Sequence, residues 1–101
     1  MRQVMARYTT HPDRADENAA LIRDVFDALR ATAPDGLTYA SYRLDDGVSC
    51  VHVASIDDTG SNSLTALSEF KAFTAGVKDR CEVPPSTTVL HEVGSYQGAH
   101  A

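Results

Sequence analysis

Residues 37–56 read LTYASYRLDDGVSCVHVASI, and this stretch decides the fold. Two runs rich in β-branched and aromatic residues, Leu37–Leu44 and Val48–Ile56, flank the tripeptide Asp45-Asp46-Gly47. Asp and Gly tolerate positive φ, so this combination is typical of a β-hairpin. The stretch therefore predicts two antiparallel strands joined by a tight turn.

The length of the turn decides the register of the hairpin. A two-residue turn at Asp46-Gly47 places Tyr42 opposite Val51, whereas a three-residue turn with a bulge pairs Tyr42 with Cys50. A slip of one residue moves every side chain to the other face of the sheet. We expect the two-residue turn, because its register brings together the most apolar side chains.

Helical patterns lie on both sides of the hairpin. Ala15–Thr32 has apolar residues at i, i+3, i+4 and i+7 spacing, which predicts an amphipathic helix. A second helix is predicted to begin near Asn62 or, after a short turn, near Ser68. Its end is predicted before the prolines that follow Val83, because proline cannot continue a helix.

Outer strands are predicted at Gln3–Thr9 and Thr87–Tyr96. The resulting order, strand, helix, strand, strand, helix, strand, is that of the ferredoxin-like βαββαβ fold. It predicts an α+β domain with a four-stranded antiparallel sheet and two helices on one face. All 101 residues are expected to form one domain, with residues 97–101 as a frayed tail.

The strands are apolar on both of their faces. Neighbouring positions that point to opposite faces are both apolar in three strands, as in Val4 with Met5, Val53 with Ala54 and Val89 with Leu90. A sheet with one face in water would show a cleaner alternation. We therefore expect a second copy of the chain to cover the helix-free face, as a homodimer.

Composition and charge argue against several classes of function. The net charge of −5 is unfavourable for binding nucleic acid, and no run approaches the about 18 apolar residues of a membrane span. Cys50 and Cys81 are far apart in the sequence and are expected to be reduced, as in a cytoplasmic protein. The four histidines lack the spacing of metal ligands, so neither a metal nor another cofactor is expected.

Short segments spread along the chain carry a resemblance to a known group of proteins. They are HPDRADE (residues 11–17), DG (46–47) followed by VHV (51–53), EFKAF (69–73), DRC (79–81) and EVGSY (92–96). In these segments the chain resembles the dimeric α+β barrel superfamily, in its antibiotic biosynthesis monooxygenase-like branch. The resemblance implies a homodimer whose two sheets close into one barrel, with a pocket in each subunit between helices and sheet.

The resemblance also implies a range of activities, among them cofactor-free quinone-forming monooxygenation and haem degradation. The haem-degrading members rely on an Asn, a Trp and a His, and the monooxygenases use a Trp beside Tyr, Asn and Arg. This chain contains no Trp, which argues against haem breakdown. No catalytic residue of the family is therefore carried over to this sequence.

Four polar residues are candidates for chemistry: His52, Tyr42, Asn62 and Arg43. A histidine titrates near neutral pH and serves as a base or ligand, a tyrosine hydroxyl orients a phenol or carbonyl, and an arginine stabilises an enolate-like charge. Asn62 lies in the loop before the second helix, comparable in place to the asparagine of the family. Each also has a structural interpretation, as a hydrogen-bonded strand residue, a side chain packed on the sheet or a helix cap.

Aromatic residues are candidates for the wall of the pocket. Phe26, Phe70 and Phe73 fall on the helical stripes, where core packing is the ordinary role and an apolar pocket wall is the functional one. Tyr8 and Tyr39 could add polar tips to such a pocket.

Two functions remain open at this point. The first is a cofactor-independent monooxygenase-like enzyme acting on a small aromatic or polyketide-like molecule. The alternative is a non-catalytic dimer that binds a small apolar or aromatic ligand, or a stress-related one. A filled, dry core would exclude both and leave a structural module.

Overall fold

The computed structural model describes residues 2–56 and 63–98. Its elements are β1 (Arg2–Thr10), a 3₁₀ turn η1 (Pro12–Arg14), α1 (Ala15–Thr32), β2 (Leu37–Arg43), β3 (Ser49–Ile56), α2 (Ser63–Ala66), α3 (Ser68–Ala75), α4 (Val77–Arg80) and β4 (Cys81–Leu90). The bounds of α1 are those predicted from its apolar periodicity.

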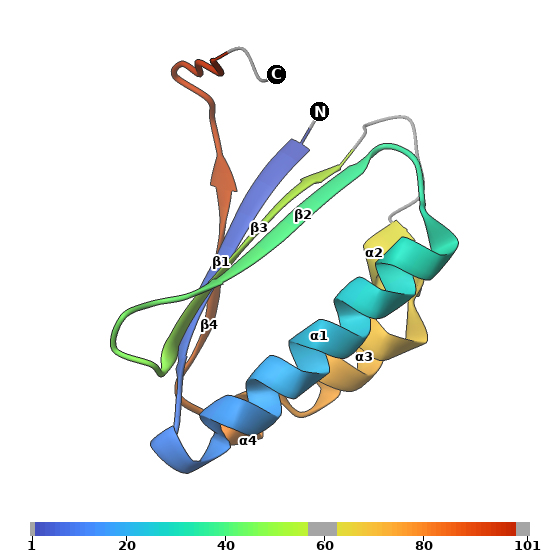
Figure 1. The fold of residues 1–101 in the computed structure, drawn as a ribbon. Coiled ribbons are helices and arrows are strands. Elements are labelled where there is room, and N and C mark those ends of the chain that lie inside the picture. Colours follow the sequence, from blue (N-terminus) through green and yellow to red (C-terminus); the bar gives the residue numbers. More distant parts are fainter. Residues whose placement is uncertain (1, 57–62, 99–101) are drawn as a thin grey trace.

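The four strands form one antiparallel sheet in the order β2-β3-β1-β4. All the helices lie on the same face of this sheet, as Figure 1 shows. The predicted ferredoxin-like α+β fold is therefore confirmed. Side chains from both layers form the core, with Tyr8 and Val25 each only 2% exposed.

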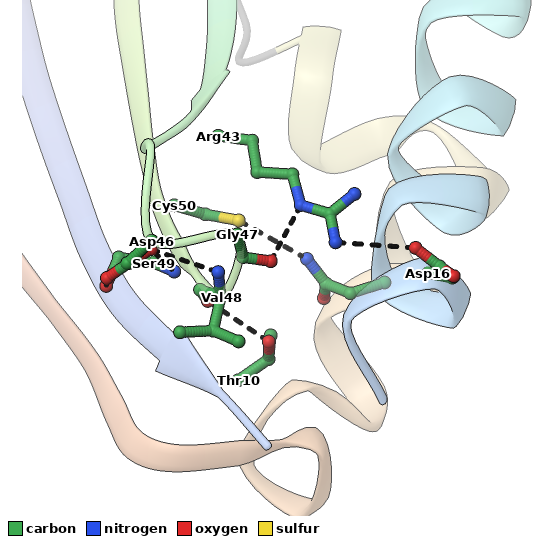
Figure 2. Close-up of polar contacts among 9 residues, drawn as sticks. Thr10, Asp16, Arg43, Asp46, Gly47, Val48, Ser49 and Cys50 are labelled. Atoms are coloured by element: carbon green, nitrogen blue, oxygen red, sulfur yellow. Dashed lines mark hydrogen bonds and ion pairs between the residues drawn. The ribbon is translucent and has the colours of Figure 1, made fainter. Parts of the chain in front are cut away.

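The hairpin has the predicted register, since Tyr42 pairs with Val51. Its loop is longer than the two-residue turn we expected, because the pairing closes with a hydrogen bond from Leu44 N to Ser49 O at 2.9 Å. The Asp46 carboxylate accepts hydrogen bonds from the backbone N–H groups of Val48 and Ser49 and from the Ser49 hydroxyl (Figure 2). These bonds hold the pKa of Asp46 below its usual range.

Gly47 has φ of 78°, a left-handed conformation that costs an L residue about 1–2 kcal/mol. A Cβ at this position would meet nothing within 4 Å, so the cost of Gly47→Ala comes from the backbone alone. We expect Gly47→Ala to lower the free energy of unfolding by about 1–2 kcal/mol in urea denaturation. Gly94→Ala, also in open space and without positive φ, is the matched control and should be neutral. Equal effects of the two variants would contradict this account.

The C-terminal part of the chain differs from the prediction. The second helix is divided into α2, α3 and α4. The alternative start near Ser68 is confirmed as the first residue of α3, whereas the start near Asn62 lies outside the described residues. The last strand is Cys81–Leu90, rather than the predicted Thr87–Tyr96.

Pro84 and Pro85, interpreted from the sequence as the stop of a helix, lie inside β4. This is possible because β4 is an edge strand, and its pairing with β1 shifts register between Arg7 and Thr9, beside the two prolines. Residues 91–98 that follow are exposed and have no regular structure.

No helix within residues 2–56 and 63–98 combines the length and the apolar character needed to cross a membrane.

Candidate functional site

A cavity of about 260 Å³ lies between the sheet and the helices α2, α3 and α4. Most of its lining is aromatic or aliphatic, and its polar groups come mainly from the sheet. The sheet contributes Tyr8, Tyr39 and His52, and the helices contribute Leu64, Phe70 and Phe73.

The strand register explains why these side chains meet. His52 in β3 is paired with Ala6 on one side and Ser41 on the other. Tyr8 and Tyr39 each lie two residues along from those partners, so they reach His52 diagonally from both neighbouring strands. The small side chain of Ala6 also leaves room beside the imidazole for the cavity.

Both ring nitrogens of His52 are hydrogen-bonded. Nε2 lies 2.7 Å from the Tyr8 hydroxyl, and Nδ1 lies 2.8 Å from the Tyr39 hydroxyl and 2.6 Å from Ser41 Oγ. The side chain is only 5% exposed, and this burial lowers the pKa of His52 to about 4. The imidazole is therefore neutral at pH 7, with one nitrogen as donor and the other as acceptor.

The two tyrosines are also held in their neutral form. Burial raises the pKa of Tyr8, against a smaller opposing effect of a hydrogen bond from Asn18. Burial likewise raises the pKa of Tyr39, opposed by a hydrogen bond from Ser41. The cavity thus presents neutral hydroxyl groups, which can stabilise negative charge on a ligand oxygen in a site with little water.

Aromatic rings form the apolar part of the site. The Phe73 ring lies 5.5 Å from the ring of His52, and the Phe70 ring lies edge-on to Tyr39 at 6.4 Å, measured between centroids. The third predicted wall residue, Phe26, stacks on Tyr39 at 5.2 Å but does not line this cavity. It borders a separate depression with Leu29.

Two other candidates lie away from His52. Tyr42 pairs with Val51 on the helix-free face and is 58% exposed. Arg43 donates to Gly47 O at 2.8 Å and contacts Asp16 of α1 at 3.3 Å (Figure 2). Both border a second cavity of about 250 Å³ between α1 and the hairpin. Asn62, the fourth candidate, lies outside the described residues.

The sequence analysis missed two buried polar residues, Asn18 and Arg80, which are 1% and 3% exposed. Asn18 Nδ2 donates to the Tyr8 hydroxyl at 2.9 Å, and Arg80 Nε donates to Asn18 Oδ1 at 3.0 Å. A usable signal existed for Asn18, because it shares the apolar stripe of α1 with Ala15 and Val25. A polar residue on the buried face of a helix needs a buried partner.

Thiol and metal chemistry have little support in the described part of the chain. Cys50 and Cys81 are buried and free, and burial raises the pKa of both thiols. Among residues 2–56 and 63–98, no three His, Cys, Asp or Glu side chains come together as a set of metal ligands.

Solved structures share this fold over nearly the whole chain. An antibiotic biosynthesis monooxygenase is 17% identical, with a TM-score of 0.76, and the match covers 93% of this chain and 100% of that one. Rv0793 from Mycobacterium tuberculosis is 22% identical, with a TM-score of 0.75 and coverage of 95% and 98%. NE2512, a protein of unknown function from Nitrosomonas europaea, is 15% identical, with a TM-score of 0.69 and coverage of 98% and 95%.

No protein-family model matches the sequence, and no curated protein matches it. At these identities the structural likeness shows the fold. The predicted resemblance to antibiotic biosynthesis monooxygenase-like proteins is therefore confirmed for the architecture of the chain.

Proposed function

We propose that the protein is a cofactor-independent monooxygenase-like enzyme that acts on a small aromatic or polyketide-like phenol. The observation that carries the proposal is the cavity of about 260 Å³, in which aromatic walls meet the neutral polar groups of Tyr8, Tyr39 and His52. The solved antibiotic biosynthesis monooxygenase of the same fold supports it.

In the proposed reaction a phenol and dioxygen yield a quinone and water. The phenol gives its proton to water, and the phenolate passes one electron to dioxygen. The resulting superoxide and aryloxyl radical combine into a peroxide anion, which takes back the proton from water to become a hydroperoxide. Loss of water from the hydroperoxide leaves the second carbonyl of the quinone. The protein contributes an apolar site and the hydroxyl of Tyr39, which donates to the phenolate oxygen and stabilises its charge.

Oxygen uptake with 1,5-dihydroxynaphthalene tests the proposal. We expect one dioxygen to be consumed for each 5-hydroxy-1,4-naphthoquinone formed. Tyr39→Phe should lower kcat/KM by about 10²-fold, since removal of one oxyanion donor has an effect of this size. Tyr42→Phe removes a hydroxyl from the helix-free face and is the matched control, expected to keep full activity. Turnover no faster than in buffer, or equal losses in the two variants, would count against an enzyme.

A non-catalytic ligand-binding or stress-related role is the second candidate. It is favoured by the hydrogen bonds of His52, whose two nitrogens are both occupied within the protein. A neutral imidazole with a pKa of about 4 is also a weak base at pH 7. Binding of 1,5-dihydroxynaphthalene without any oxygen uptake would favour this role over catalysis.

We further propose that the protein forms a homodimer through its helix-free face. Apolar side chains of three strands lie there, and beyond β4 Val93 and Tyr96 are almost fully exposed, at 103% and 94%. Light scattering at micromolar concentration should give the mass of a dimer, and Val53→Glu on this face should give a monomer. A wild-type monomer would refute the proposal.

The two free cysteines of the protein are consistent with a cytoplasmic location.

A further inference from the structure

A chain of hydrogen-bonded side chains runs through the core from α4 to the cavity. It begins at Arg80, passes through Asn18 in α1 and the Tyr8 hydroxyl, and reaches Nε2 of His52, with donor-acceptor distances of 3.0, 2.9 and 2.7 Å. Arg80 is held in place by a second bond, from Nη2 to Phe73 O at 2.7 Å. The chain therefore links a buried cation to the imidazole of the cavity.

Arg80 sets the donor-to-acceptor direction of these hydrogen bonds. A guanidinium only donates, so the Asn18 atom that faces Arg80 is the carbonyl oxygen. The amide nitrogen of Asn18 then faces Tyr8 and donates to its hydroxyl oxygen. The Tyr8 oxygen accepts this bond, and the acceptor of the Tyr8 hydroxyl hydrogen depends on the tautomer of His52.

The two tautomers of His52 place that hydrogen differently. With the imidazole hydrogen on Nδ1, the Tyr8 hydroxyl donates to Nε2 and Nδ1 donates to the Ser41 hydroxyl. Ser41 in turn donates to the Tyr39 hydroxyl, so each acceptor receives one hydrogen. With the hydrogen on Nε2, the Tyr8 oxygen accepts twice, and its hydrogen is left with the thiol of Cys50, a weak acceptor. The tautomer with the hydrogen on Nδ1 is favoured, because all its hydrogen bonds run in one direction and polarise one another.

We propose that Arg80 is a positioning residue which, through Asn18 and Tyr8, fixes His52 as the Nδ1–H tautomer. These hydrogen bonds then end at Tyr39, whose own hydroxyl hydrogen is used by none of them and is offered to a molecule in the cavity. The ligand is therefore a flat, apolar molecule with an accepting oxygen, such as a ketone or phenolate. This choice of ligand rests on the proposed function, whereas the tautomer does not.

Nitrogen-15 NMR of the ligand-free protein tests the tautomer, because protonated and unprotonated imidazole nitrogens have well-separated shifts. We expect Nδ1 of His52 to be the protonated nitrogen in the wild type. In Asn18→Asp the carboxylate can only accept, so Tyr8 donates to it and the imidazole hydrogen moves to Nε2. Arg80→Leu should give a mixture of tautomers, and the exposed Arg30→Leu should match the wild type. An Nε2–H wild type, or no change in Asn18→Asp, would overturn the proposal.

Two probes of similar size test the class of ligand. 1-Indanone only accepts hydrogen bonds and indole only donates them, so 1-indanone should bind at least about 10-fold more tightly, a difference of about 1.4 kcal/mol. Tyr39→Phe should abolish this preference. If the tautomer is as expected but indole binds equally well, the ligand assignment fails while the role of Arg80 stands. If 1-indanone binds more tightly as expected but the tautomer is not the expected one, the role of Arg80 is refuted and the ligand assignment stands.

Discussion

Replacement of Phe73 by alanine is expected to lower the free energy of unfolding by about 3–5 kcal/mol. Phe73 is 5% exposed, and its ring lies 6.4 Å from that of Tyr8 and 5.5 Å from that of His52. The guanidinium of Arg80 also lies 5.2 Å from the centre of the Phe73 ring. The loss is large beside the total stability of about 5–15 kcal/mol of an ordinary domain.

Urea denaturation monitored by circular dichroism measures this loss. Phe26→Ala is the control, because Phe26 is only partly buried and stacks on Tyr39 at the border of the core. Phe73→Leu should keep most of the stability, with a loss under about 1.5 kcal/mol, since it conserves most of the volume. A loss in Phe73→Ala no greater than in Phe26→Ala would show that the ring cluster is not the centre of the core.

Acidification from pH 7.5 to pH 5 is expected to remove about 2 kcal/mol of stability through His52 alone. The pKa of this histidine is about 4 in the folded protein against 6.5 in the unfolded chain. Between these values the unfolded state binds the proton and the folded state does not, so stability falls as the pH falls through this window. The effect is complete below about pH 4 and absent well above pH 6.5.

The pH dependence is checked by urea denaturation at several pH values. His52→Gln removes the titrating group, so its stability should fall less steeply between pH 7.5 and pH 5 than that of the wild type. His91→Gln changes a histidine on the exposed segment after β4 and should retain the wild-type slope. The same slope in His52→Gln and in the wild type would show that the imidazole does not stay neutral in the core.

The sequence predicted the elements whose patterns are strong and local. The bounds of α1 were correct because its apolar stripe runs over 18 residues. The register of the hairpin was correct because only one choice brings the apolar side chains together. The last strand was placed too late, because two adjacent prolines usually mark the end of a helix and only the sheet order shows that they lie on an edge.

The candidate site was only partly predictable. His52, Phe70 and Phe73 line one cavity, and the register explains why Tyr42 does not join them, since it lies one residue out of phase with the strand positions that face the helices. The pair of Asn18 and Arg80 spans 62 positions of the sequence. Contacts of this range depend on how α1 and α4 pack together, and no local pattern contains that information.

Pro84 and Pro85 have a consequence for how copies of the protein can meet. Successive residues of a strand direct their N–H groups to opposite sides, so in an edge strand two adjacent prolines remove one donor toward the sheet and one toward solvent. A strand from another molecule would lack a donor at this point of β4, and the change of register beside it would bend the ladder further. The outer edge of β4 is thereby protected against open-ended strand addition and fibre growth.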